Sequence, residues 1–547
     1  MEQIFYNGKI ITMKEVSAKE ALSKAPDAVL VRDGIIAQIG KFDKIMEAAS
    51  EQVVIRNLQG KCLMPSFIDT HSHFVMNGQM SAWANLSECE SFEDIVVTLT
   101  DYIVKNNITE DGVVLGFGYD HNFLREGKQP DKTILDRVSS KIPIFILHIS
   151  AHLGCANSAA LQLAGIDEMT NDPQGGKIGR MSESNIPSGY LEESGINILQ
   201  RAIFPRIVMD YGQTIKKMQN LYIENGITTV QDGASTENDI NILIKMSESG
   251  ALKLDVVSYP LMSADGIRLM EMYGLQYKSY VNRFRIGGYK LVLDGSPQGK
   301  SAWMSKPYTG DGENYCGYPW LHDKDVENYL RHAVGEKQQV LAHCNGDAAS
   351  EQFIVLYDKV IKEEGCDDNL RPVMIHCQTV RNDQLDRMAR LGMIASIFVG
   401  HIWYWGDIHI KNFGLERGNH ISPVRDAINR GVKVTFHQDT PVTKPNMLHS
   451  IWCAVNRVSR SGNIIGKDQQ IDVYDALKAV TINAAYQYFE EDNKGVIEEG
   501  KKADLVILDQ SPLEVDKICI KDIKVLETIK DGKTIYMSNF VESATKI

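Results

Sequence analysis

The chain has 547 residues, which is too long for one simple domain, and its apolar and charged fractions are ordinary for a globular protein. It carries 58 basic and 71 acidic residues, a net charge of -13, and this balance argues against nucleic acid or an anionic membrane as the main partner. We therefore expect a small-molecule substrate, with no nucleic acid and no membrane partner. The chain could also form a homodimer.

The N-terminal sequence "MEQIFYNGKIITMKE" lacks a basic region followed by a long apolar core, so we expect no signal peptide. No uncharged apolar run is long enough to span a bilayer. The nine cysteines are scattered and form no C-x-x-C pair. An odd, unpatterned set of this kind is typical of reduced thiols and predicts a cytoplasmic protein.

The first predicted elements are a hairpin at 27–40, "DAVLVRDGIIAQIG", with Asp-Gly between two alternating apolar runs, and a strand at 62–70. His71 and His73 come directly after that strand. Side chains alternate faces along a strand, so both imidazoles would point the same way and could hold one metal ion. The alternative is a polar strand end with two surface histidines.

About 150 residues separate this strand from the next apolar run, against roughly 30 for one strand–helix unit. We therefore predict an inserted α/β subdomain at 76–210, which would act as a lid. It contains its own strands, "GVVLGFG" and "IPIFILHIS", and helical stretches around 91–107 and 210–225.

Short apolar runs then alternate with helical stretches such as 350–365 and 382–392. Counted with the first strand, there are about eight runs, the number that a closed parallel barrel needs. The sequence thus predicts an α/β fold, a (β/α)8 TIM-like barrel. The runs lie at 62–70, 228–233, 253–260, 285–295, 338–344, 371–377, 392–398 and 433–439.

The C-terminal end repeats the hairpin pattern in "KADLVILD" and "LETIKDGKTIYM". These strands predict a small composite β-sandwich domain formed by both termini, although two separate caps on the barrel would fit the residues alone. The expected division is residues 1–62 and 491–547 for the composite domain and 63–490 for the barrel with its insertion.

Polar residues occupy several of the predicted strand ends, where chemistry lies in a barrel of this kind. Lys290 lies in the fourth run, and His343, His376 and Asp439 end the fifth, sixth and eighth. Each has a structural alternative: a loop cap, a buried histidine, a surface lysine or an Asx-turn. Taken together and in this order, they favour one metal site.

A protonated Lys290 among histidines and a divalent cation would be repelled. It fits such a site only when it is neutral or converted to an anion. Carboxylation by CO2 gives a carbamate with two oxygen donors, which can bridge two metal ions.

With these residues, the chain resembles the metal-dependent amidohydrolase superfamily, and within it the branch that resembles N-substituted formamide deformylase (amidohydrolase family 3). The shared motifs span almost the whole length. They include "PSFIDTHSHF", "GFGYDHNFLREGKQPDKTILDRV", "AHLGCANSAAL", "KLVLDGSPQGKSAW", "AHCNGDAA", "HQDTPV", "TINAAYQ" and "GVIEEGKKADLVILD".

The resemblance implies a divalent metal cofactor, with one or two Zn2+ ions expected. The implied ligands are His71, His73, carboxylated Lys290, His343, His376 and Asp439. Two departures stand out: relatives commonly have Pro-Gly where this chain has Pro65-Ser66, and Glu where it has Ile375. Alternation along the strand would turn Ile375 away from the ligand face.

The implied function is cleavage of a C–N bond in an amide, formamide or cyclic amide by metal-activated water, with Asp439 as general base. The enzyme class would be hydrolases acting on carbon–nitrogen bonds other than peptide bonds. Two alternatives remain: hydrolysis of an ester or phosphoester on the same centre, and a catalytically silent binding or regulatory protein.

Four residues are candidates for substrate contact. In the family, the segment of the insertion that carries His152 faces the site. Trp303, His401 and Trp405 belong to aromatic groups near predicted strand ends, and an aromatic pocket suits a hydrophobic or ring-bearing substrate. The alternatives are a structural histidine in a turn and plain aromatic core.

Overall fold

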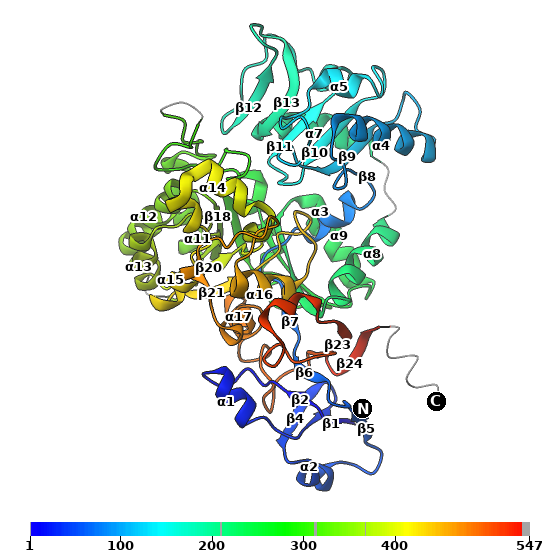
Figure 1. Cartoon of the computed structure of the whole chain (residues 1–547), viewed down its shortest axis with the longest axis vertical. Coiled ribbons are helices and arrows are strands. Elements are labelled where there is room, and N and C mark those ends of the chain that lie inside the picture. The colour runs from blue at the N-terminus through cyan, green and yellow to red at the C-terminus, as the bar shows by residue number, and fades with distance from the viewer. Residues whose placement is uncertain (1, 208–210, 311–313, 367, 539–547) are drawn as a thin grey trace.

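The computed structural model describes residues 2–207, 211–310, 314–366 and 368–538. Three regions follow one another along the long axis of the molecule (Figure 1). The insertion lies at one end, parallel strands surrounded by helices lie in the middle, and β-structure from both ends of the chain lies at the other end. The predicted boundaries include residues 1, 208–210 and 539–547, which lie outside the described residues.

The central strands are parallel and form two sheets, with orders β16-β15-β14-β7 and β17-β18-β19-β20-β21. They match the eight predicted runs, since β16 and β17 divide the fourth. Their bounds are β7 (Phe67–Ile68), β14 (Ile227–Ser235), β15 (Asp255–Pro260), β16 (Phe284–Ile286), β17 (Gly288–Val292), β18 (Gln339–Cys344), β19 (Val373–His376), β20 (Ile394–Ile397) and β21 (Lys433–Phe436).

The two sheets meet at two seams. At one, β16 continues into β17 across Gly287, and Leu261 forms a parallel bridge with Lys290. At the other, the Thr70 hydroxyl donates to Phe436 O at 2.9 Å, next to the end of β21. The described residues thus confirm the parallel α/β arrangement, but they form two joined sheets and not the single closed sheet that we predicted.

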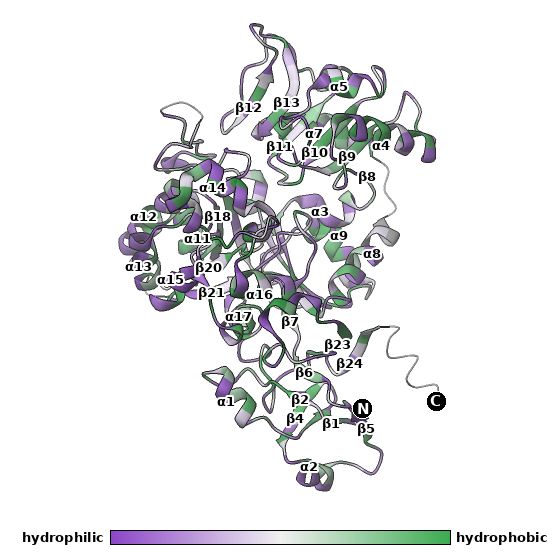
Figure 2. Ribbon diagram, viewed as in Figure 1, coloured by the Kyte–Doolittle hydropathy of each residue, from purple (hydrophilic) through white to green (hydrophobic). Residues whose placement is uncertain are grey.

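Apolar side chains from both sheets meet between them, and the helices pack outside. Ile68, Val257, Leu341 and Ile375 share one buried cluster, which Tyr488 also joins. The stretches 350–365 and 382–392 are helical as predicted (α12 and α13), and the outer surface of α13 is largely hydrophilic (Figure 2). The helices of this region are α3 (Phe74–Met80), α8 (Tyr211–Ile223), α9 (Glu237–Glu248), α10 (Ile267–Leu269), α11 (Asp323–Gly335), α12 (Asp347–Glu363), α13 (Asn382–Arg390), α14 (His401–Asn419), α15 (Val424–Asn429), α16 (Met447–Asn456), α17 (Val473–Ala479) and α18 (Ile482–Gln487).

The insertion has a sheet of its own, in the order β12-β13-β11-β10-β9-β8, with β8, β9 and β10 parallel. Two apolar cores lie on the two sides of this sheet. Its strands are β8 (Ala84–Asn85), β9 (Val114–Tyr119), β10 (Ile144–His148), β11 (Leu153–Ala156), β12 (Gly176–Arg180) and β13 (Pro187–Glu193), and its helices are α4 (Phe92–Lys105), α5 (Lys132–Asp136), α6 (Ser158–Leu163) and α7 (Ser194–Ile203).

Strands from both ends of the chain pack together in the third region. The sheet β4-β3-β1-β5 shares one apolar core with the sheet β2-β6-β22-β23-β24, in which β6 lies between N-terminal β2 and C-terminal β22. Their bounds are β1 (Glu2–Tyr6), β2 (Lys9–Ile10), β3 (Ala28–Arg32), β4 (Ile35–Gly40), β5 (Val54–Asn57), β6 (Cys62–Pro65), β22 (Leu505–Leu508), β23 (Val525–Lys530) and β24 (Lys533–Met537), and the helices are α1 (Ala18–Ser23) and α2 (Phe42–Ala48).

Asp-Gly turns close both hairpins of this region. Asp33 and Gly34 have φ of 48° and 84°, and Asp531 and Gly532 have 47° and 71°. Positive φ at both central positions is the tight hairpin geometry that Asp-Gly favours. The run 62–70, read from the sequence as one strand, is in fact two: β6 belongs to the terminal sheet, and β7 begins the central one.

Among the described residues, no helix is both long enough and apolar enough to cross a bilayer.

A buried ion network ties the terminal sheets to the central strands. Asp255 of β15 accepts from Lys494 at 2.8 Å and from Lys530 of β23 at 2.6 Å, and Lys530 also donates to Asp504 at 2.6 Å. All four side chains are buried. Removing one partner from such a network leaves a buried charge uncompensated.

We expect Lys530→Met to lower the free energy of unfolding by about 3–5 kcal/mol, because two buried carboxylates lose their shared cation. Lys533→Met, in the exposed part of the same hairpin, should change it by less than about 0.5 kcal/mol. Urea unfolding of both variants measures the difference. Equal stabilities would mean that the network does not hold the two regions together.

Candidate metal centre

His71 and His73 lie in the loop after β7 and not on the strand itself, so strand alternation does not explain why they meet. Backbone hydrogen bonds fix this loop: Gly233 N donates to Ser72 O, and His73 N donates to Thr440 O, both at 2.8 Å. The loop is thereby held between the carboxyl ends of β14 and β21.

The tautomers of the two rings follow from their partners. The Gln231 amide nitrogen donates to Thr70 O at 2.7 Å, so its oxygen faces His71 Nδ1 at 2.6 Å and accepts a proton from it. His73 Nδ1 lies 2.8 Å from Gly233 O, which can only accept. In the neutral rings, both Nε2 atoms therefore carry lone pairs.

These two lone pairs point at a carboxylate. Asp439 Oδ1 lies 3.3 Å from His71 Nε2 and 3.4 Å from His73 Nε2, and it is buried without a hydrogen-bond partner. Burial raises the pKa of Asp439, but the neighbouring His73 and His71 outweigh it and hold the carboxyl ionised. Burial also lowers the pKa of His71 far below its ordinary value, so that ring keeps no second proton at neutral pH. With neutral rings these acceptor atoms repel one another, and a cation among them would remove that repulsion.

Lys290 reaches the same point from β17. Its Nζ lies 3.4 Å from His71 Nε2, and the side chain is buried. Burial lowers the pKa of Lys290 to about 7, although the Asp439 carboxylate partly opposes the shift. A lysine with this pKa has a substantial unprotonated fraction at neutral pH, and the free amine is the form that reacts with CO2.

His376 and His343 complete the predicted set, in two different positions. A ring nitrogen of His376, one of His71 and an oxygen of Asp439 all lie within 4.8 Å of one another. The His343 ring packs on His376 with centroids 4.4 Å apart, and its Nδ1 lies 3.2 Å from Asp294 Oδ1. His343 is therefore beside the centre and in contact with it.

Backbone geometry turns His376 inward. Ile375 lies in the buried cluster between the sheets, so alternation would point His376 outward; its φ of 71° reverses that direction. Our expectation that alternation removes Ile375 from the ligand side is therefore wrong. Asp439, with φ of 53°, also has a backbone conformation with positive φ, which is uncommon for residues other than glycine. Such conformations persist where the surrounding structure enforces them, as at functional sites.

The four predicted substrate contacts differ in position. His152 Nδ1 donates to the Glu193 carboxylate at 2.7 Å, and the His152 ring lies 5.0 Å from that of His343. Burial lowers the pKa of His152, but Glu193 outweighs it, so the net shift is upward. The insertion thus reaches the centre through His152.

The aromatic candidates contact the centre through other residues. His401 and Trp405 are buried and contact the centre through Phe398, whose ring lies 6.3 Å from that of His376. The Trp303 ring packs on the main core, and its backbone N–H, at 3.0 Å, donates to Asp294.

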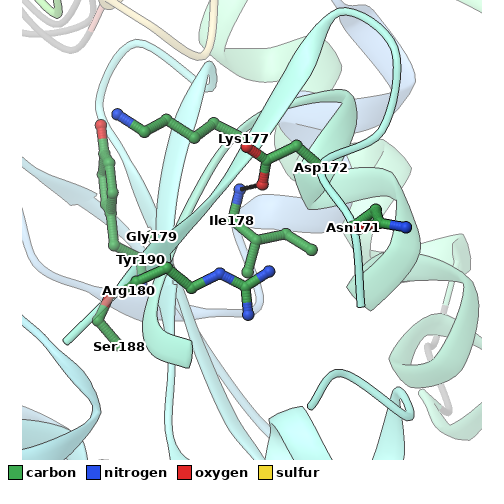
Figure 3. Close-up of a pocket in the computed structure, with 8 residues that line it drawn as sticks. All are labelled: Asn171, Asp172, Lys177, Ile178, Gly179, Arg180, Ser188 and Tyr190. Atoms are coloured by element: carbon green, nitrogen blue, oxygen red, sulfur yellow. Dashed lines mark hydrogen bonds between the residues drawn. The ribbon is translucent and has the colours of Figure 1, made fainter. Parts of the chain in front are cut away.

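A pocket of about 560 Å3 lies on the insertion, between β12, β13 and the segment before them (Figure 3). Its lining includes Asp172, Lys177, Arg180 and Tyr190. Arg180 donates to the backbone carbonyls of Asp167 and Asn185, so its guanidinium stabilises the neighbouring loops. None of the predicted ligands lines this pocket.

The model of the Amidohydrolase family matches residues 54–536. The chain belongs to this family. It is 26% identical to "Protein LONG AFTER FAR-RED 3" of Arabidopsis thaliana, over 96% of this chain and 91% of that one. It is also 26% identical to "N-substituted formamide deformylase" of Arthrobacter pascens, over 96% and 98%. Membership implies metal-dependent hydrolysis of amide-type bonds and a TIM-barrel-like α/β fold.

A solved structure supports the fold. An uncharacterized metal-dependent hydrolase of Pyrococcus horikoshii is similar with a TM-score of 0.75 and 24% identity, over 94% of this chain and 99% of that one. The resemblance to amidohydrolases drawn from the motifs is thus confirmed.

Sequence reasoning missed several residues of this amidohydrolase. His437 is buried and packs on His71 and His376, with ring centroids 5.2 and 5.1 Å apart. Burial lowers its pKa to about 3, partly opposed by Asp439. The repeat of the His-x-acceptor spacing in "HQD" was the available signal. Gln231 and Asp294 carry no such signal, because their roles depend on tertiary contacts.

We expect Gln231→Leu to weaken metal binding about 10- to 100-fold, because His71 loses the partner that fixes its tautomer. Competition with a chromogenic chelator measures the affinity. Gln276→Leu, at an exposed position, is the control. Unchanged affinity in Gln231→Leu would show that this contact does not orient the ring.

Proposed function

We propose that the chain hydrolyses a C–N bond other than a peptide bond, in an amide, formamide or cyclic amide, on a divalent metal held by the predicted centre. The proposed ligands are His71, His73, carboxylated Lys290, His343, His376 and Asp439. Zinc is the proposed metal, because imidazole and carboxylate donors suit it. The proposal covers one or two ions.

The observation that carries the proposal is the convergence of lone pairs on Asp439 Oδ1. His71 Nε2 and His73 Nε2 lie 3.3 and 3.4 Å from this oxygen, and all three are acceptors when the rings are neutral. A cation between them would turn mutual repulsion into attraction. The outer nitrogens already donate to Gln231 and Gly233, as metal-binding histidines commonly do.

When bound, the metal lowers the pKa of water and polarises a carbonyl. Asp439 is proposed as the general base: an ionised carboxylate that takes the proton of the attacking water and delivers it to the leaving amine. His152, whose pKa is raised mainly by Glu193 against burial, is proposed as a donor to the substrate oxygen.

The region assignments belong to the same proposal. Residues 63–490 would form the hydrolase region, residues 76–210 its lid, and 1–62 with 491–547 the composite β-domain. The contact between His152 and His343 supports the lid, because it joins the insertion to the centre. Trp303, His401 and Trp405 are proposed to shape the substrate side.

The substrate class is supported by the relative from Arthrobacter pascens, named as a deformylase of N-substituted formamides. We expect zinc-reconstituted protein to cleave members of a panel of N-formyl, N-acyl and cyclic amides, and Asp439→Asn to be about 100- to 10,000-fold slower. Amine release measures the rate, with Asp43→Asn on the exposed face of α2 as control.

Matched esters and phosphoesters complete the panel. Faster cleavage of these substrates than of the amides would show that the enzyme is an ester or phosphoester hydrolase and would refute the proposed C–N specificity. A protein that neither binds zinc, iron or manganese nor gains activity when they are added would be a silent binding or regulatory protein. Near-normal turnover in folded Asp439→Asn would refute its role as base.

Lys290→Ala should lower the bound metal content, because the proposed carbamate ligand would be lost. Short carboxylic acids should restore part of the metal content and activity by placing a carboxylate in the vacated space. Metal analysis with and without propionate tests this, and Lys324→Ala, at an exposed position of α11, is the control. Unchanged metal stoichiometry in Lys290→Ala would count against a carbamate ligand.

A further inference from the structure

A second group of metal-binding side chains lies in the insertion, on elements that carry none of the predicted ligands. Asp120 and His121 follow β9, and His148 is the last residue of β10. These two strands are parallel neighbours, with Tyr119 paired to His148. The three side chains therefore meet at the carboxyl edge of a parallel pair, where loops gather polar groups.

The ligand atoms form a compact triangle with two shorter edges and one longer edge. His121 Nδ1 lies 3.2 Å from His148 Nε2, His148 Nε2 lies 3.3 Å from Asp120 Oδ1, and His121 Nδ1 lies 3.8 Å from that oxygen. Bonds of about 2.0–2.1 Å to one tetrahedral ion would set its ligands about 3.3 Å apart. Two of the three separations match one face of such a site, and the third, at 3.8 Å, is longer.

We propose that Asp120, His121 and His148 bind a second transition-metal ion, of the zinc class, and that this ion fastens the insertion to α14. Two imidazoles and one carboxylate favour zinc or cobalt over magnesium or calcium, which prefer all-oxygen sites. Asp120 and His148 are buried, whereas the His121 side chain is 18% exposed and leaves an entry path.

The surroundings orient the ligands. Trp405 of α14 donates its indole N–H to Asp120 Oδ2 at 2.8 Å, which leaves Oδ1 toward the histidines. Asn122 donates to Oδ1 through its backbone N–H at 2.9 Å and its amide at 3.0 Å. An ion here would thus act on α14 through Asp120 and Trp405.

The outer nitrogen of His148 distinguishes two states. Nδ1 lies 2.9 Å from Ser150 Oγ and accepts the backbone N–H of Ser150 at 3.1 Å, so the proton of the neutral ring lies on Nε2 in this structure. An ion on Nε2 would require the proton to move to Nδ1, which would then donate to the Ser150 hydroxyl and no longer accept the backbone N–H. Without an ion, Nδ1 can accept the backbone N–H while Nε2–H donates to Asp120 or His121, a plain hydrogen-bond network.

The experiment compares His121→Gln with His322→Gln, an exposed histidine before α11. Both full-length proteins are stripped with a chelator, confirmed folded by circular dichroism, and titrated with Zn2+ by calorimetry and metal analysis. We expect His121→Gln to bind one equivalent less. The same difference should persist in an Asp439→Asn background, which separates this site from the proposed hydrolytic centre.

A second readout is amide hydrogen exchange. In His322→Gln, Zn2+ should slow amide exchange in segments 114–122 and 144–150. In His121→Gln, the exchange rates of these segments should not change when Zn2+ is added. The partly exposed position of His121 makes a folded variant attainable even if His148→Gln does not fold. Equal zinc stoichiometry in His121→Gln and His322→Gln would overturn the proposal and leave the hydrogen-bond network as the explanation.

Discussion

The candidate centre depends on one electrostatic constraint: acceptor atoms are held against one another inside the protein. His71 Nε2 and Asp439 Oδ1 lie 3.3 Å apart, and the His71 ring keeps only its Nδ1 proton. Buried lone pairs at this distance cost free energy unless positive charge lies between them. Gln231 fixes this arrangement. Its amide nitrogen donates to Thr70 O, so its amide oxygen is left to accept the hydrogen bond from His71 Nδ1. The hydrogen bond from His71 to Gln231 therefore leaves an acceptor atom facing Asp439, and this arrangement favours a positive charge between the two side chains.

Strained backbone and close packing sustain this arrangement. His376 and Asp439 have positive φ, a conformation that costs about 1–3 kcal/mol at a non-glycine residue. Beneath them, an apolar layer that includes Leu341 and Ile375 fills the space between the sheets, and Tyr488 donates its hydroxyl to Asp69 O next to the His71 loop. The packing energy of this layer offsets the strain, so the position of each acceptor is a property of the whole barrel-like region.

Much of the architecture was readable from sequence, because hydrophobic periodicity is a local signal. The apolar runs of the central region gave strands near their predicted bounds, and both Asp-Gly hairpins formed. The division of the central strands into two joined sheets, the inward turn of His376 and the outer partners Gln231 and Asp294 could not be read, since each depends on contacts between distant segments. Alternation along a strand also fails where a predicted ligand lies in a loop, as His73 does.

The same topological rule operates twice in this chain. In both the central region and the insertion, polar side chains gather at the carboxyl ends of parallel strands. Aromatic rings connect the two places: Trp405 packs on His401 with centroids 4.7 Å apart, His401 packs on Phe398 at 4.7 Å, and Phe398 packs on His437 at 5.4 Å. Because these rings are buried and in contact, a displacement of the insertion at Asp120 must repack the wall beside the centre. The position of the insertion and the packing beside the candidate centre are therefore coupled through these rings.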